Sequence, residues 1–232
     1  MFKPKITITS VIGPSHIDHH LPNQDAVFKK TWEDFWLVVV CDGLGSRKLS
    51  HIGAKVACHT VYEVVSTSKF DSEPHLLAFN IHKIWHERLL KQGVDIKEAN
   101  TTCLFAWGHS SGKIRLFQLG DGLIMAQTDN FYMLQNKVDK SFSNETTALG
   151  ILRGWDDWSY ATLQITKTRQ GIALMTDGIS DDITDYMGFM HYLNTSFCHV
   201  NPRKIKKKIK HELIHWNTPY HSDDKSIGLI LF

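Results

Sequence analysis

The sequence predicts an α+β sandwich, in which two mainly antiparallel sheets pack together and helices cover them. Three observations support this fold class. Short apolar or alternating runs, which are typical of strands, recur along the chain between turn residues. Two long helical patterns follow the third predicted strand, and two more precede the last strand. Strands and helices do not alternate regularly, which disfavours a doubly wound parallel sheet.

The first predicted strands differ in how they are patterned. Lys5–Val11 alternates between polar and apolar residues, as a half-exposed strand does. Leu37–Val40 is apolar at every position, which indicates a strand buried on both faces. A polar loop is expected between Gly13 and Asp25. The strands expected in this part of the chain are Lys5–Val11, Ala26–Lys30 and Phe35–Cys41.

Helical periodicity follows the third strand. One helix is expected at about His51–Ser66, with Ser50 as its N-cap. A second is expected at Pro74–Lys91, with Leu76 and Phe79 among its core residues. Two later helices are expected, one at Ile183–Leu193 and a basic one that begins at Pro202. The lysines of the basic helix fall mostly opposite its apolar stripe, which favours a solvated outer face over an acidic partner.

The remaining strands are predicted to form a meander, followed by a pair of strands and a last strand. Lys137–Asp157 is polar and irregular, and we expect it to form a short flap near a site. The expected strands are Thr101–Gly108, Lys113–Leu119, Leu123–Thr128, Phe131–Leu134, Tyr160–Ile165, Gly171–Thr176 and Ser226–Phe232.

Length and composition restrict the class of protein. The chain has 232 residues, which fits a single domain over residues 1–232. Its net charge of +2 gives no general attraction to nucleic acid or to a membrane surface. No apolar stretch approaches the roughly 18 residues that span a bilayer, and no signal peptide is seen. The four cysteines are scattered, as in a reducing compartment, so a cytoplasmic location is expected.

Carboxylates recur where predicted strands end. Asp42 and Asp177 each follow an apolar run and precede a glycine. Asp121 lies between two glycines, and Asp223 with Asp224 precedes the last strand. Oxygen ligands are what magnesium and manganese prefer, so these positions indicate a site for hard cations. The crowded histidines at 16, 19 and 20 are interpreted instead as solvated loop residues, because no supporting histidine cluster is seen elsewhere.

Short motifs in a fixed order resemble those of the metal-dependent protein phosphatases of type 2C. The residues within these motifs are most similar to those of a compact bacterial branch of that family. No single motif is specific, but their order and spacing cover nearly the whole chain. The resemblance implies an α-β-β-α sandwich, in agreement with the fold class above. The motifs are Asn23-Gln24-Asp25-Ala26, Asp42-Gly43-Leu44-Gly45, Gly53-Ala54, Thr101-Thr102, Gly120-Asp121-Gly122, Asn144–Gly150, Thr176-Asp177-Gly178 and Asp223-Asp224-Lys225-Ser226.

The resemblance implies two Mn²⁺ or Mg²⁺ ions, and a weaker third. Asp42 would bridge the two ions, and Asp25 would hold metal-bound water in the outer shell. Between Asp223 and Asp224 the motif favours the first as a ligand, with an ambiguity of one residue. The implied catalytic residues are Asp42, Asp177, Asp223 and Asp25. The implied metal ligands are Asp42, the carbonyl of Gly43, Asp177, Asp223 and, for the third ion with Asp177, Asp121.

The chain departs from the family pattern at three positions. The arginine that grips phosphate in many members is absent, and His16 or His20 could substitute for it as a substrate-binding donor. Gln24 replaces a more common glutamate. Leu44 stands where some relatives carry a histidine suspected of protonating the leaving group, so water, His16 or His51 would have to do so.

Three functions compete. The leading hypothesis is a serine/threonine protein phosphatase, with a phosphorylated protein as substrate, a cognate Ser/Thr kinase as its opposing partner, and a monomeric state. The rival is a pseudophosphatase that acts as a binding or regulatory module, motivated by the missing arginine and glutamate. A metal phosphodiesterase or nuclease shares the ion chemistry but lacks a basic stripe leading to the site.

Overall fold

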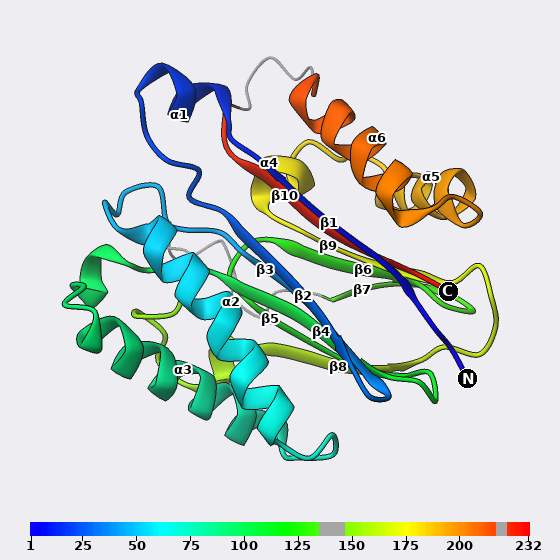
Figure 1. The fold of residues 1–232 in the computed structure, drawn as a ribbon, viewed down its shortest axis with the longest axis horizontal. Coiled ribbons are helices and arrows are strands. Elements are labelled where there is room, and N and C mark those ends of the chain that lie inside the picture. The colour runs from blue at the N-terminus through cyan, green and yellow to red at the C-terminus, as the bar shows by residue number, and fades with distance from the viewer. Residues whose placement is uncertain (135–146, 217–221) are drawn as a thin grey trace.

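The computed structural model describes residues 1–134, 147–216 and 222–232. Two five-stranded antiparallel sheets form its centre (Figure 1). The first sheet has the order β1 (Lys5–Val11), β10 (Lys225–Leu231), β9 (Gly171–Met175), β6 (Leu123–Gln127), β7 (Phe131–Leu134). The second has the order β2 (Ala26–Trp32), β3 (Phe35–Cys41), β4 (Cys103–His109), β5 (Lys113–Leu119), β8 (Ser159–Gln164). The predicted α+β sandwich is confirmed.

Helices cover the outer face of each sheet, so the molecule has four layers. Helices α2 (Ser50–Thr67) and α3 (Pro74–Lys91) lie on one side, and α5 (Tyr186–Phe197) and α6 (Pro202–Ile214) on the other (Figure 1). Four short elements complete the described chain. They are α1 (Pro14–Asp18), α4 (Asp177–Ser180) and the 3₁₀ turns Ile96–Glu98 and Trp155–Asp157.

The apolar run in β3 is buried on both faces, as its pattern predicted. Leu37, Val39 and Cys41 belong to the core between the second sheet and α2 and α3. Val38 and Val40 belong to the core between the two sheets. Because successive side chains of a strand point to opposite faces, only an unbroken apolar run can serve two cores.

The predicted meander is wrong at one place. The segment Gly120–Gly122 does not turn β5 back into its own sheet, because β6 and β7 pair in the first sheet and β8 takes the place beside β5. Gly120 has a φ of +104°, a conformation that favours glycine. The crossing brings Asp121 to the end where both sheets carry their carboxylates.

Several helix expectations need correction. The N-cap of α2 is Leu49, with Ser50 inside the helix, and the helix expected at Ile183–Leu193 is α5, which begins three residues later. Its N-cap is Asp185, whose carboxylate accepts the N–H of Gly188 at 2.8 Å. The loop before Asp25 contains the unpredicted helix α1, which the proline at its first turn favours.

The outer side of α3 also differs from the expectation. Leu76 is 50% exposed and Phe79 is 63% exposed, whereas Leu77, Ile81 and Trp85 carry the packing. The lysines of α6 face solvent, as predicted, while Ile205, Ile209 and Leu213 are buried. Residues 137–146 of the expected flap lie outside the described residues. Within the described chain, no helix has the length and apolar character needed to cross a membrane.

Candidate metal and phosphate site

Asp42 follows β3 directly, and two threonines hold its backbone in place. Its N–H donates to the hydroxyl of Thr102 at 2.9 Å, and its carbonyl accepts the N–H of Thr102 at 2.7 Å. The hydroxyl of Thr101 donates to the same carbonyl at 2.8 Å. Gly43 donates its N–H to the carbonyl of Gln24 at 3.2 Å. With its backbone groups satisfied in this way, the Asp42 carboxylate is held at the end of the sandwich.

Asp25 is fixed from both sides of the molecule. Its N–H donates to the side chain of Asn23 at 2.9 Å, which forms a local turn before β2. Its Oδ2 accepts the hydroxyl of Thr176 at 3.1 Å, across a separation of 151 residues. Thr176 in turn accepts the N–H of Ser226 at 3.0 Å. This chain of contacts joins the end of the first sheet to the beginning of β2.

Asp177 is the first residue of α4 and follows the end of β9. A Cβ atom placed at the next residue, Gly178, would lie 2.1 Å from the carbonyl oxygen of Asp224. This close approach allows the turn that carries Asp177 to lie against the segment that carries Asp223 and Asp224. Glycine at position 178 therefore brings two of the predicted site segments together.

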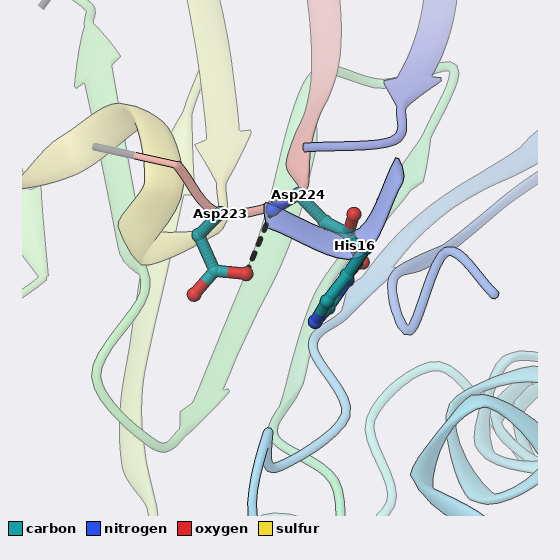
Figure 2. Close-up of side chains that lie close together, drawn as sticks. All are labelled: His16, Asp223 and Asp224. Carbon is teal, nitrogen blue, oxygen red and sulfur yellow. Dashed lines mark hydrogen bonds and ion pairs between the residues drawn. The ribbon is translucent and has the colours of Figure 1, made fainter. Parts of the chain in front are cut away.

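The two neighbouring aspartates before β10 differ completely in environment. Asp224 is 2% exposed, and its carboxylate accepts the N–H of Gly13 at 2.7 Å and that of Gln24 at 2.6 Å. It also contacts Nδ1 of His16 at 2.9 Å. Asp223 is exposed, and its Oδ1 accepts the N–H of Asp224 at 2.7 Å. Figure 2 shows the Asp223 carboxylate and the His16 ring extending on the same side of this segment.

The pKa shift of Asp42 shows which other carboxylates lie close to it. Burial first, and then the negative charges of Asp25 and Asp177, raise the pKa of Asp42 well above its ordinary value. The charge of Asp223 acts in the same direction. Four carboxylates that are distant in sequence are therefore close enough to repel one another.

The same effects act on the neighbours of Asp42. Burial, with a contribution from the charge of Asp224, raises the pKa of Asp25 to about 8. Burial, together with the charges of Asp121 and Asp223, raises the pKa of Asp177. Asp121 thus lies near Asp177, the residue with which the family resemblance paired it.

The donor set of this cluster fits hard divalent cations. Asp25 Oδ1 and Asp177 Oδ1 are buried and accept no hydrogen bond from the part of the chain that the structure describes. Buried carboxylates without donors are costly unless a cation compensates their charge. Oxygen ligands from several carboxylates are what Mn²⁺ and Mg²⁺ take.

The two predicted phosphate donors lie in different environments. His16 is 8% exposed and bonds to Asp224, so its interpretation as a solvated loop residue is wrong. His20 is exposed at the end of the α1 loop, with a φ of +55°. The structure therefore brings His16 to the acidic cluster and leaves His20 at the surface.

Sequence reasoning missed the residues that hold the site together. The role of Asp224 as an anchor for three nitrogen donors, and that of Thr176 as a bridge to Asp25, depend on contacts over more than a hundred positions. A useful signal was present for Asp224, since two adjacent aspartates before a strand cannot both point the same way.

Fold and site together define a class of protein: an α-β-β-α sandwich with a carboxylate cluster at one end. The family model of protein phosphatase 2C matches residues 12–214. The chain belongs to the protein phosphatase 2C family. The comparison with curated protein sequences found no match.

Solved structures share this fold at low sequence identity. PppA, described as a key regulatory component of T6SS in Pseudomonas aeruginosa, is 15% identical with a TM-score of 0.72, over 99% of this chain and 98% of that one. The catalytic domain of the serine threonine protein phosphatase PstP, in complex with 2 manganese ions, is 11% identical with a TM-score of 0.70, over 98% and 97%. RsbX in complex with magnesium is 13% identical with a TM-score of 0.63, over 97% and 94%.

Proposed function

We propose that the protein is a metal-dependent serine/threonine phosphatase that hydrolyses phosphomonoesters on proteins. The observation that carries this proposal is the convergence of Asp25, Asp42 and Asp177, whose pKa values are raised by burial and by the charges of neighbouring carboxylates. Such an arrangement costs free energy unless cations compensate the negative charges. Membership in the protein phosphatase 2C family and the manganese ions of PstP support the same proposal.

Several carboxylates and one backbone carbonyl would bind the metal ions. Asp42, Asp177 and Asp223 would hold Mn²⁺ or Mg²⁺, with the carbonyl of Gly43 as a further ligand. Asp121 would join Asp177 at a weaker third position. When bound, the ions lower the pKa of water toward neutrality and offset the charge of a phosphate dianion. The assignment of Asp223 rather than Asp224 is supported by the three nitrogen donors that already occupy Asp224.

Other residues would order what the cations attract. Asp25 is held by Thr176 and Asn23, so its remaining buried oxygen can accept a hydrogen bond from water beside Asp42. His20 is exposed and could donate to a phosphate oxygen only from outside the cluster. The three buried cysteines are free and lie in the cores, so covalent cysteine chemistry is not part of the proposal.

The direct test is phosphate release by the purified chain from an aryl phosphate and from a phosphothreonine peptide. We expect release with Mn²⁺, its loss in EDTA, and recovery when Mn²⁺ is restored. Asp42→Asn is the matched variant, because it keeps the side-chain shape and removes the charge. Absence of activity with every divalent cation tried would contradict the proposal.

The second candidate is a regulatory binding module that has kept the fold without turnover. The observation that favours it is the absence of an arginine at the position before Asn23 where the family grips phosphate. PppA is itself described as a regulatory component. Calorimetric titration with Mn²⁺ separates the candidates, because a module without catalysis has no need of a tight site that Asp42→Asn abolishes.

A further inference from the structure

The His16 side chain lies in the candidate site together with Asp223 and Asp224. One potential ligand atom from each of these residues lies within 4.8 Å of the others. His16 is more than nine-tenths buried, although α1, which carries it, is at the surface of the molecule (Figure 1). The family resemblance assigned no metal ligand at this position.

Hydrogen bonds determine which nitrogen of His16 carries the proton. Oδ2 of Asp224 contacts Nδ1 at 2.9 Å and also accepts the N–H of Gln24 at 2.6 Å. Oδ1 accepts the N–H of Gly13 at 2.7 Å. Since backbone N–H groups can only donate, both oxygens of Asp224 act as acceptors, and Nδ1 is assigned the proton. In the neutral ring, Nε2 then carries the lone pair.

That lone pair has no hydrogen-bond partner among the residues that the structure describes. Within the described chain, no hydrogen bond is formed by Nε2, whereas Nδ1 is fully engaged. Figure 2 shows the ring leading away from Asp224, with a nitrogen at its far tip and the Asp223 carboxylate on the same side. A histidine that donates one N–H to a carboxylate and presents the other nitrogen freely has the usual arrangement of a metal-ligating histidine.

We propose that Nε2 of His16 is a ligand of a divalent cation held jointly with Asp223, and that Asp224 is the positioning residue that orients the ring. Imidazole nitrogen suits Co²⁺ and Zn²⁺ far better than Mg²⁺, which prefers oxygen and water, and Mn²⁺ accepts it less readily than Co²⁺ or Zn²⁺. His16 therefore biases the site toward transition metals. This inference rests on the proposed metal centre, but it makes a separate claim about the donor set.

Pulsed EPR of the Mn²⁺-loaded wild-type chain tests this ligand directly. We expect a ¹⁴N coupling from imidazole without any phosphate present, which is replaced by a ¹⁵N coupling when the protein is labelled with ¹⁵N-histidine. His16→Gln should remove the coupling. His19→Gln is the matched control, because His19 is the exposed C-cap of the same helix α1, three residues away, and should leave the coupling unchanged.

Calorimetry measures the selectivity. His16→Gln should lower the affinity for Zn²⁺ at least about 10-fold, lower that for Mn²⁺ by a smaller factor, and change that for Mg²⁺ less than about 3-fold. If His16→Gln does not fold, the labelled wild-type protein alone decides the question. Manganese binding that Asp42→Asn abolishes but that shows no histidine coupling would overturn the His16 proposal and leave the phosphatase proposal standing. A coupling that appears only after phosphate is added would also overturn it, and would make His16 a substrate donor.

Discussion

The backbone N–H of Gln24 donates to Oδ2 of Asp224 at 2.6 Å, across 200 positions of the sequence. This contact links the segment before β2 to the segment before β10, and therefore the second sheet to the first. Asp25 follows Gln24, and Asp223 precedes Asp224. The hydrogen bond thus sets the distance between two carboxylates that the proposed chemistry needs close together.

Replacing Asp224 should mainly lower the stability of the protein, whereas replacing Asp223 should mainly weaken Mn²⁺ binding. Asp224→Ala removes a buried carboxylate that accepts from three nitrogen donors, so we expect a loss of about 3 kcal/mol or more in the free energy of unfolding. Asp223→Ala removes an exposed side chain and should cost less than about 1 kcal/mol. Urea denaturation measures both variants, and Mn²⁺ titration should show the larger defect in Asp223→Ala if that variant folds as expected. Equal stability losses would contradict the assignment of the two roles.

Asp42→Asn should separate activity from stability. Loss of the carboxylate proposed to hold the cations should lower Mn²⁺ affinity and phosphate release by more than about 100-fold. The same change removes repulsion from Asp25 and Asp177, so we expect the melting temperature in EDTA at pH 8 to rise. Differential scanning calorimetry and a phosphate assay on the same samples test both halves. A fall in melting temperature would show that Asp42 is held by compensating contacts.

Without cations, the protein should lose stability as the pH rises. Burial raises the pKa of Asp25 to about 8 from 3.8, so between these values the unfolded chain has lost a proton that the folded chain retains. The free energy of unfolding therefore falls with increasing pH, by up to about 1.4 kcal/mol per pH unit for each such carboxyl. Asp42 and Asp177 act in the same direction. Melting temperatures in EDTA from pH 5 to pH 8 measure the slope.

Two additions make this pH series decisive. Saturating Mn²⁺ should flatten the slope and raise the melting temperature most at pH 8, because the cation favours ionised carboxylates and binds only the folded chain. Asp25→Asn should reduce the slope in EDTA by removing one titrating group. A stability in EDTA that increases from pH 5 to pH 8 would contradict the raised pKa values.

Gly178 should be intolerant of a methyl group. A Cβ at this position would lie 2.1 Å from the carbonyl oxygen of Asp224, so Gly178→Ala must push apart the segments that carry Asp177 and Asp223. We expect a loss of about 1–3 kcal/mol and a weaker Mn²⁺ site. Gly154→Ala is the control, since no described atom beyond its chain neighbours lies within 4 Å of a Cβ there and its φ of 163° is extended. Similar effects in both variants would exclude the close-approach explanation.

Much of the fold could be predicted because it depends on local patterns. The unbroken apolar run of β3 requires burial on both faces, and the proline at the start of α3 and α6 marks each helix where the structure begins it. The carboxylates at strand ends were also visible, because a strand that stops at an aspartate and a glycine has a local signature. Their convergence beside Asp42 could be predicted only from several motifs in order, because no single motif is specific.

The sequence by itself determined the fold class, the strand ends and the acidic residues of the candidate site, because periodicity and turn chemistry act over a few neighbouring residues. The tertiary structure alone decided that β6 joins the first sheet and that Asp224 anchors while Asp223 is left exposed. It also decided that His16 is buried beside them. These outcomes depend on contacts between segments about two hundred positions apart, whose geometry exists only when both sheets are packed together.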